Sequence, residues 1–311
     1  MLQVLFCGTM MLKGCVPMSK RLKPINDFIF KKVFGEEESK DHLISFLNAV
    51  LDLKDEKRLA TIEIIENKEL ISELIEDKTS RLDVRARTAD GTQLNIEVQL
   101  TNQKNMDKRS LFYWGKLFID GIKKGQDYIN LCKVITINIL DFNFLDIDKF
   151  NSTFHLREDS CKDFMLTDLV EIHFIELPKF RAYSEKNFRE NHLHRWLSFL
   201  EEDIPDETLK ELMEMDDSIK KAEERLEYLS SDPSTIELYR KREESLHERA
   251  NMISSAMEKG MEKGIEQGKQ ARNIEIVMQA IKEGLPANVV ARITGLSTDE
   301  VKELVSKLAN N

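Results

Sequence analysis

The chain has 311 residues, of which 46 are Lys or Arg and 56 are Asp or Glu, so its net charge is −10. This length is enough for a substantial core and for more than one domain. The acidic balance excludes a protein that binds nucleic acid through overall charge alone. The charged fraction of 33% is high and the hydrophobic fraction of 41% slightly low, which indicates a compact domain joined to charged, extended helices.

The cysteines and the N-terminus indicate a cytoplasmic protein. Four cysteines, at positions 7, 15, 132 and 161, show no Cys-x-x-Cys or Cys/His metal spacing, so we expect reduced thiols. No stretch is apolar and long enough to cross a membrane. Residues 1–17 are too short and too broken for a convincing signal peptide, and we expect residues 1–19 to be a disordered extension.

The first elements of the chain are two helices and a strand. Asn26 or Asp27 can cap a helix over residues 27–34, and the apolar spacing of residues 43–51 predicts a second helix. A strand near residues 61–65 then precedes a polar loop.

Residues 81–100 alternate between apolar and polar side chains on both sides of Ala89-Asp90-Gly91, which predicts a two-stranded hairpin. Because each strand has one apolar face, the faces match only if the loop has an odd number of residues. A three-residue loop pairs Asp83 with Glu97 and leaves Gln99 two residues further along the same face. Gly91 suits the left-handed position that such a turn requires.

Two acids that face each other need a counter-charge, because like charges directly opposite destabilise a sheet. A divalent cation fits, since hard oxygen ligands on a rigid support can converge on it. The alternative is neutralisation by the neighbouring Arg81 and Arg85, since half-solvated hairpins often carry charges on one face.

The surroundings of the hairpin are basic, in contrast to the whole chain. Residues 78–124 contain ten Lys or Arg and five Asp or Glu, a local net charge of +5. A basic surround with acids at its centre suits a metal-dependent enzyme that acts on a polyanion. Ordinary surface charge is the alternative.

After the hairpin, a helix over residues 106–124 precedes strands near 132–142, 154–157 and 169–177. The first of these strands is almost continuously apolar, as expected when both faces are covered. His173, inside the last strand, is predicted to be a satisfied core histidine. The order of elements predicts an α/β domain with a mixed sheet flanked by helices.

The rest of the chain is predicted to be all-helical. An amphipathic, acidic helix over residues 209–228 is broken at 230–234, and a long charged helix follows. Gly260, Gly264 and Gly268 would lie on one helix face, which indicates a close helix contact or a flexible linker.

The last residues have the pattern of a small helical unit. Residues 291–301 have a helix-turn-helix cadence, but Asp299, Glu300 and Glu303 on the last helix would repel phosphates. We therefore expect packing or oligomerisation from this unit rather than DNA reading.

Four segments taken together resemble a known family. They are Asp27–Gly35 (DFIFKKVFG), Leu82–Ala86 (LDVRA), Asn95–Gln99 (NIEVQ) and Arg109–Trp114 (RSLFYW). In this order they are similar to the PD-(D/E)XK nuclease family transposases, also called the recombination-promoting nuclease family. The resemblance covers about residues 20–200 and implies a restriction-endonuclease-like domain there.

The remaining residues divide into two predicted regions. Residues 201–270 are expected to form a charged helical linker or oligomerisation region, through which the chain would form a homodimer. Residues 271–311 are expected to form a small helical tail.

The resemblance implies a Mg²⁺-dependent DNA endonuclease that promotes DNA recombination or transposition. By position, Asp83 and Glu97 match the two metal-binding acids of the signature, and Gln99 stands where lysine is usual. Glutamine supplies only a neutral hydrogen bond, so more charge stabilisation falls to the metal or to arginines. Because no basic recognition helix is visible, we expect little sequence specificity.

Further candidate residues have an ordinary alternative. Asp27, near Lys31 on the first helix, is a candidate third acid, and its alternative role is a simple N-cap. Lys31, Arg109, Tyr113 and Lys116 are candidate contacts to the DNA backbone, and the last three would otherwise form a solvated helix flank.

The competing function is a catalytically weak DNA-binding or assembly protein on a nuclease scaffold. An RNA-directed nuclease is a third alternative, because the metal chemistry does not distinguish the sugars. Intact Asp83, Glu97 and Gln99 favour an active endonuclease, whereas the acidic total charge and the missing lysine leave room for the weak form.

Overall fold

The computed structural model describes residues 21–65, 83–123 and 125–309. Contacts between Cα atoms divide the chain into two compact units, residues 1–246 and residues 247–311. The expected extension over residues 1–19 and the polar loop after residue 65 lie outside the described residues.

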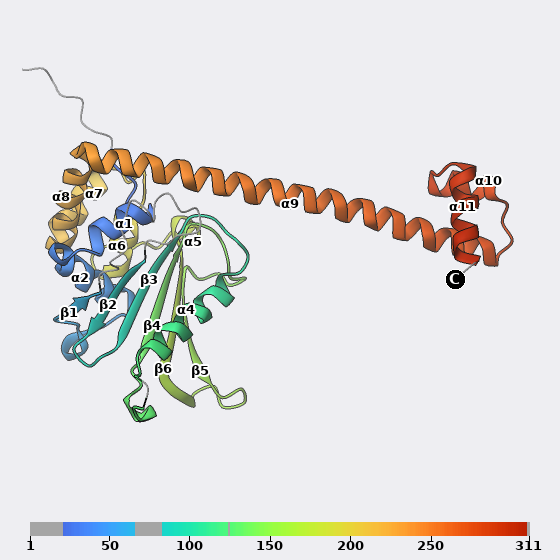
Figure 1. The fold of residues 1–311 in the computed structure, drawn as a ribbon. Coiled ribbons are helices and arrows are strands. Elements are labelled where there is room, and N and C mark those ends of the chain that lie inside the picture. Colours follow the sequence, from blue (N-terminus) through green and yellow to red (C-terminus); the bar gives the residue numbers. More distant parts are fainter. Residues whose placement is uncertain (1–20, 66–82, 124, 310–311) are drawn as a thin grey trace, which may run out of the picture. The chain divides into compact units, whose positions relative to one another are not determined.

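Within the described ranges, six strands form one mixed sheet in the order β1-β2-β3-β4-β6-β5 (Figure 1). Strands β3, β4 and β6 are parallel to one another, and the remaining neighbouring pairs are antiparallel. This sheet and the helices around it confirm the predicted α/β class. The strands are β1 (Ile62–Ile64), β2 (Val84–Thr88), β3 (Gln93–Gln99), β4 (Val134–Leu140), β5 (Asn151–Arg157) and β6 (Met165–Glu176).

The main core lies on one face of the sheet, against α1 (Asp27–Phe34), α2 (Lys40–Val50) and α6 (His192–Phe199). The Asn26 side chain caps α1 by accepting hydrogen bonds from the backbone N–H groups of Phe28 and Ile29. Aromatic rings from the three helices meet at centroid distances of 4.5–6.0 Å. These rings are Phe30, Phe34, Phe46 and Trp196, and all four are fully buried.

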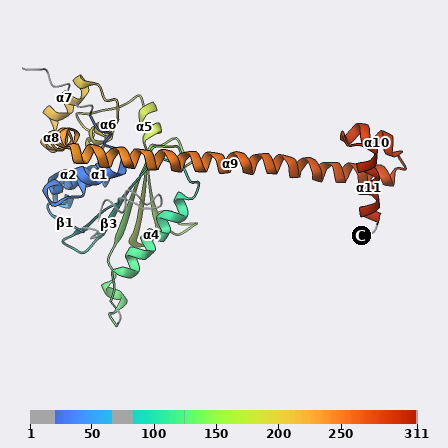
Figure 2. The ribbon, with the colours of Figure 1, turned by 45° about the horizontal axis from the view of Figure 1, so that its top comes forward.

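The opposite face of the sheet is covered by α4 (Met106–Asp120), which Figure 2 shows lying along the strands. Met106 and Leu117 are its buried apolar side chains. The Trp114 indole Nε1 donates to the carbonyl oxygen of Val134 at 3.2 Å, which ties the middle of α4 to the start of β4. Both faces of β4 are thus covered, and every residue of this strand is buried as its apolar run predicts.

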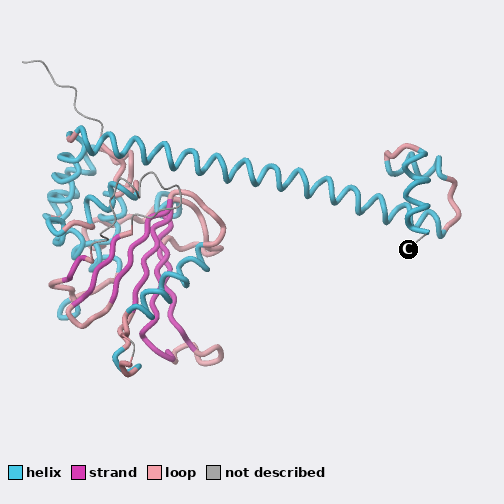
Figure 3. Tube along the Cα trace, viewed as in Figure 1, coloured by secondary structure: helices cyan, strands magenta, loops and turns pink. Residues whose placement is uncertain are grey.

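The elements described after β6 are all helices (Figure 3). The predicted helix over residues 209–228 is wrong in one respect, because Asp216 separates it into two helices. The Asp216 side chain accepts from the Ser218 N–H and so caps the second helix, which ends one helix and starts the next. The helices are α5 (Leu177–Ala182), α7 (Asp206–Met215), α8 (Asp217–Ser231) and α9 (Pro233–Lys282).

The glycine-rich repeat is helical, so the flexible-linker interpretation is wrong. Helix α9 is 50 residues long and runs through Gly260, Gly264 and Gly268. A Cβ atom added at any of the three would meet no atom within 4 Å in the described part of the chain. The charged side chains that flank the glycines favour helix, which outweighs the glycine penalty over this length.

The second unit has its own small core. Val277 and Ala280 of α9 pack with Val290 and Ala291 of α10 (Ala287–Thr294) and with Val301 of α11 (Thr298–Ala309). Gly295 ends α10 in the left-handed conformation, with φ of +72°. The helix-turn-helix cadence of the sequence therefore corresponds to two helices that pack against the end of α9.

Candidate active site

The hairpin has the register that the sequence predicts. Val84 pairs with Ile96 and Arg85 with Asn95, so one more step along the strands brings Asp83 opposite Glu97. The Thr88 N–H donates to the Thr92 carbonyl at 3.0 Å, which closes the three-residue loop. The paired residues of β2 and β3 therefore keep one apolar and one polar face in common.

Gly91 makes this turn possible. Its φ is +86°, a backbone conformation that residues with a Cβ rarely adopt. A Cβ at this position would also lie 3.0 Å from the Cys132 sulfur. The turn thus depends on glycine at position 91, and the register of the two acids depends on the turn.

Asp83 lies immediately before β2 and is neutralised within its own strand. The Arg85 Nε donates to Asp83 Oδ2 at 2.7 Å, and the Asp83 side chain is 12% exposed. Arg85 pairs with Asn95 across the hairpin, and residues two apart on a strand share a face. Asp83 therefore lies on the face that carries Asn95 and Glu97.

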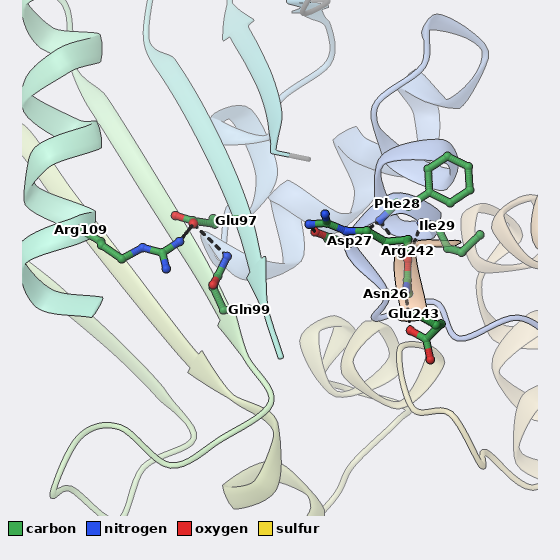
Figure 4. Close-up of polar contacts among 9 residues, drawn as sticks. All are labelled: Asn26, Asp27, Phe28, Ile29, Glu97, Gln99, Arg109, Arg242 and Glu243. Carbon is green, nitrogen blue, oxygen red and sulfur yellow. Dashed lines mark hydrogen bonds and ion pairs between the residues drawn. The ribbon is translucent and has the colours of Figure 1, made fainter. Parts of the chain in front are cut away.

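Glu97 is buried beneath α4, where two donors converge on one of its oxygens (Figure 4). Arg109 Nη2 lies 2.5 Å from Glu97 Oε1, and Gln99 Nε2 donates to the same oxygen at 3.0 Å. The side chains of Glu97 and Arg109 are 4% and 8% exposed. The alternative role of Arg109 as part of a solvated helix flank is wrong, because its guanidinium is buried under α4 against Glu97.

Asp27 opens α1 and is buried against α9. Its Oδ1 accepts from Arg242 Nε at 3.0 Å, and its Oδ2 lies 2.5 Å from Arg242 Nη2. Asn26 rather than Asp27 supplies the cap, and its amide also donates to Glu243 at 2.7 Å. In this structure both oxygens of Asp27 contact an arginine (Figure 4).

The other candidate DNA-contacting residues differ in their exposure to solvent. Lys116 is exposed on α4, and Tyr113 is half-buried with its ring perpendicular to that of Phe112. Lys31 is half-buried on α1, and its Cγ is 3.2 Å from the position that a Cβ on Gly35 would take. The same Gly35 position is 3.1 Å from Val84, so Lys31 lies next to the start of β2.

A polar layer under α4, not foreseen from the sequence, adjoins the site. Ser110 Oγ donates to Asn138 Oδ1 at 2.9 Å, and Asn138 Nδ2 donates to the His173 carbonyl at 3.0 Å. Asn95 and Thr136, which pair across β3 and β4, are buried in the same layer. The signal available in the sequence was the pair of polar residues inside the apolar run of β4.

Comparison with known proteins identifies the family. The model of the PD-(D/E)XK nuclease family transposases matches residues 24–256, which is more than half of the chain. The chain belongs to the PD-(D/E)XK nuclease family transposases. No curated protein and no solved structure gives a significant match.

Membership of the PD-(D/E)XK nuclease family transposases confirms the resemblance and the restriction-endonuclease-like fold class. The match extends to residue 256 and so includes the first half of α9, whereas the resemblance seen in the sequence covered about residues 20–200. A nuclease-like role follows from the family. No helix in the described ranges has the length and apolarity needed to span a bilayer.

The donor set of this PD-(D/E)XK family member fits a hard divalent cation. Asp83 and Glu97 supply carboxylate oxygens, and Mg²⁺ is usually held by one or two protein carboxylates while it keeps several waters. The described residues contain no group of three or more His, Cys, Asp or Glu that could hold a metal by themselves. A cation held by these two carboxylates alone would need water or substrate oxygens as its other ligands.

Proposed function

We propose that this protein is a Mg²⁺-dependent DNA endonuclease that promotes DNA recombination or transposition. The observation that carries the proposal is the hairpin register, in which Val84 pairs with Ile96, so that the next residues outward, Asp83 and Glu97, are expected opposite each other on the polar face. Both carboxylates are largely shielded from solvent, at 12% and 4% side-chain exposure. Each acid also contacts an arginine, Asp83 with Arg85 and Glu97 with Arg109, so a metal ion would bind in competition with these two contacts.

In this proposal Asp83 and Glu97 would hold Mg²⁺, and the chemistry that the ion would supply is activation of a water and polarisation of the scissile phosphate. Gln99 positions Glu97 by donating to its Oε1. Arg85 balances the charge of Asp83. Asp27 supports the site indirectly by fixing the start of α1 through Arg242.

Contacts to the DNA backbone are proposed for Lys31, Tyr113 and Lys116. Lys116 is exposed on α4, and Arg109 of the same helix contacts Glu97. Such contacts hold the backbone without reading bases. Asp299 and Glu300 are exposed in the first turn of α11 and would repel phosphates, which supports cutting with little sequence specificity.

Nicking of supercoiled plasmid in Mg²⁺ tests this function. We expect the wild-type chain to nick DNA and Asp83→Ala to lose nearly all activity. Asp107→Ala removes an exposed acid from α4 and is the matched control, for which we expect wild-type activity. Equal activity in wild type and Asp83→Ala would contradict the proposal, and defined fragments from one substrate would contradict the low specificity.

We also propose that the enzyme acts as a homodimer in the cytoplasm. Residues 254–272 of α9 are exposed on all sides, so this stretch has surface available for a second copy. Cys132 and Cys161 are free thiols, which supports a reducing compartment. Light scattering on the full chain and on a chain that ends at residue 246, the boundary of the first compact unit, tests the dimer, and a monomeric full chain would contradict it.

A further inference from the structure

Arg109 is a cation that the candidate site already contains. Its Nη2 and the neutral Nε2 of Gln99 converge on the same oxygen, Glu97 Oε1, at 2.5 and 3.0 Å. Residue 99 on β3 and residue 109 on α4 thus reach one atom from two different elements (Figure 4). A positive charge at either position would act on the same carboxylate.

The guanidinium of Arg109 has more donors than acceptors around it. Its Nε and Nη1 are buried and have no hydrogen-bond partner within the described residues. Arg242 shows the usual alternative, since its Nε and Nη2 contact both oxygens of Asp27. Buried N–H groups without acceptors cost free energy, and Arg109 leaves two of its nitrogens in this state, so its guanidinium has hydrogen-bonding capacity that Glu97 does not use.

We propose that Arg109 is a positioning residue of the nuclease site, which acts through Glu97 and supplies the positive charge that Gln99 lacks. This inference rests on the proposed function. Two opposite consequences follow from the charge. It opposes the binding of a second cation at Glu97, and it favours the negative charge that develops on the phosphate during hydrolysis.

The balance of these two effects distinguishes the proposed role of Arg109 from a merely structural one. In a site shielded from water, repulsion between two nearby cations outweighs the modest gain from holding one carboxylate in place. Removal of the charge at residue 109 should therefore tighten cation binding and slow cleavage at the same time. A residue with a merely structural role would weaken both, together with the stability of the fold.

The test compares Arg109→Gln, Arg109→Lys and the double variant Arg109→Gln with Gln99→Lys. Mg²⁺ and Mn²⁺ affinity is measured by calorimetry, and plasmid cleavage is measured at saturating Mg²⁺. We expect Arg109→Gln to bind the cation about tenfold more tightly and to cleave about tenfold or more slowly. Arg109→Lys keeps the positive charge but not the guanidinium geometry, so it should lie between Arg109→Gln and wild type in both measurements.

The double variant moves the charge from α4 to β3, because a lysine at 99 reaches the oxygen that Gln99 reaches now. We expect it to bring both cation affinity and cleavage back towards wild type. Arg195→Gln is the matched control, since Arg195 is a buried arginine of α6 that pairs with Asp216 at 3.4 Å. It should lose stability without a change in cation affinity.

Loss of cation affinity and cleavage together in Arg109→Gln would overturn the inference, as would a double variant that restores neither. If Arg109→Gln does not fold, Gln99→Lys alone decides, because a second positive charge at Glu97 should weaken cation binding, and an unchanged affinity would contradict the proposal. A wild-type chain without cation uptake would instead overturn the proposed function itself.

Discussion

Asp27 and Arg242 form a buried, two-contact ion pair although they are 215 positions apart in the chain. The pair joins the first residue of α1 to the part of α9 that belongs to the first compact unit. Because Asp27 is 6% and Arg242 only 2% exposed, neither charge can be solvated if the other is removed. The start of α9 is therefore a structural part of the nuclease domain.

Arg242→Met should strongly destabilise the first unit. The substitution leaves a buried, unpaired carboxylate, which costs about 3–5 kcal/mol of unfolding free energy. Urea denaturation followed by the fluorescence of Trp114 and Trp196, both in the first unit, measures this loss. Glu243→Gln, which changes the half-buried partner of Asn26, is the control and should cost about 1 kcal/mol or less. Similar small effects of both substitutions would contradict the structural role of the pair.

Gly91→Ala should weaken the hairpin and the site together. The left-handed backbone costs about 1–2 kcal/mol for a residue with a Cβ, and the new atom would press against Cys132. Gly125→Ala is the matched control, because Gly125 also has a positive φ but its added Cβ meets no atom of the described chain within 4 Å. Denaturation should show a loss of stability in both variants, larger in Gly91→Ala because of the contact with Cys132, whereas plasmid nicking should fall only in Gly91→Ala. Full activity of Gly91→Ala would count against the register as the basis of the site.

Gly264→Ala should strengthen α9. The position lies inside a helix, and the added Cβ would meet nothing within 4 Å in the described residues, so the change should gain about 1 kcal/mol of helix stability. Hydrogen exchange of the amides around residue 264 measures the gain as increased protection. Reduced protection would show that the glycine surface is in contact with a partner in solution.

The lowered pKa of Glu171 predicts that the fold loses stability at low pH. Burial by itself would raise the pKa of this carboxyl, but hydrogen bonds and charge from His173 and Lys133 outweigh it and lower the pKa from 4.5 to about 2. A depressed pKa gives stability that is complete above the unfolded-state value and is lost as the pH falls towards 2. Thermal unfolding from pH 5 to pH 2 should therefore show a smaller decline for Glu171→Gln than for wild type. An equal decline would assign the acid sensitivity to other groups.

The local features of the fold could be predicted from the sequence because their causes are local. The alternation of polar and apolar residues, together with Gly91, fixes the β2–β3 register. The continuous apolar run of β4 predicts that both faces of this strand are buried. The confirmed register is what brings Asp83 and Glu97 into opposition. His173 is buried and bonded to Glu171 and Thr153, as expected for a satisfied core histidine.

The features that could not be predicted depend on tertiary contacts. No local pattern links Asp27 to Arg242, because the pair forms only when α9 packs beside α1. Arg109 is part of a helix with exposed Leu111 and Phe112, so helical periodicity alone does not show that the arginine lies inside. The break at Asp216 was missed because its capping role depends on one side-chain hydrogen bond rather than on a proline or glycine.

Calorimetric titration of Mg²⁺ into the wild-type chain, Asp83→Ala, Glu97→Ala and the double variant tests whether Asp83 and Glu97 share one metal ion. We expect cation uptake by wild type that either single substitution nearly abolishes and that the double substitution reduces no further, because both acids hold one ion. Uptake that persists in the double variant, or that is lost in only one single variant, would contradict a metal site shared by Asp83 and Glu97.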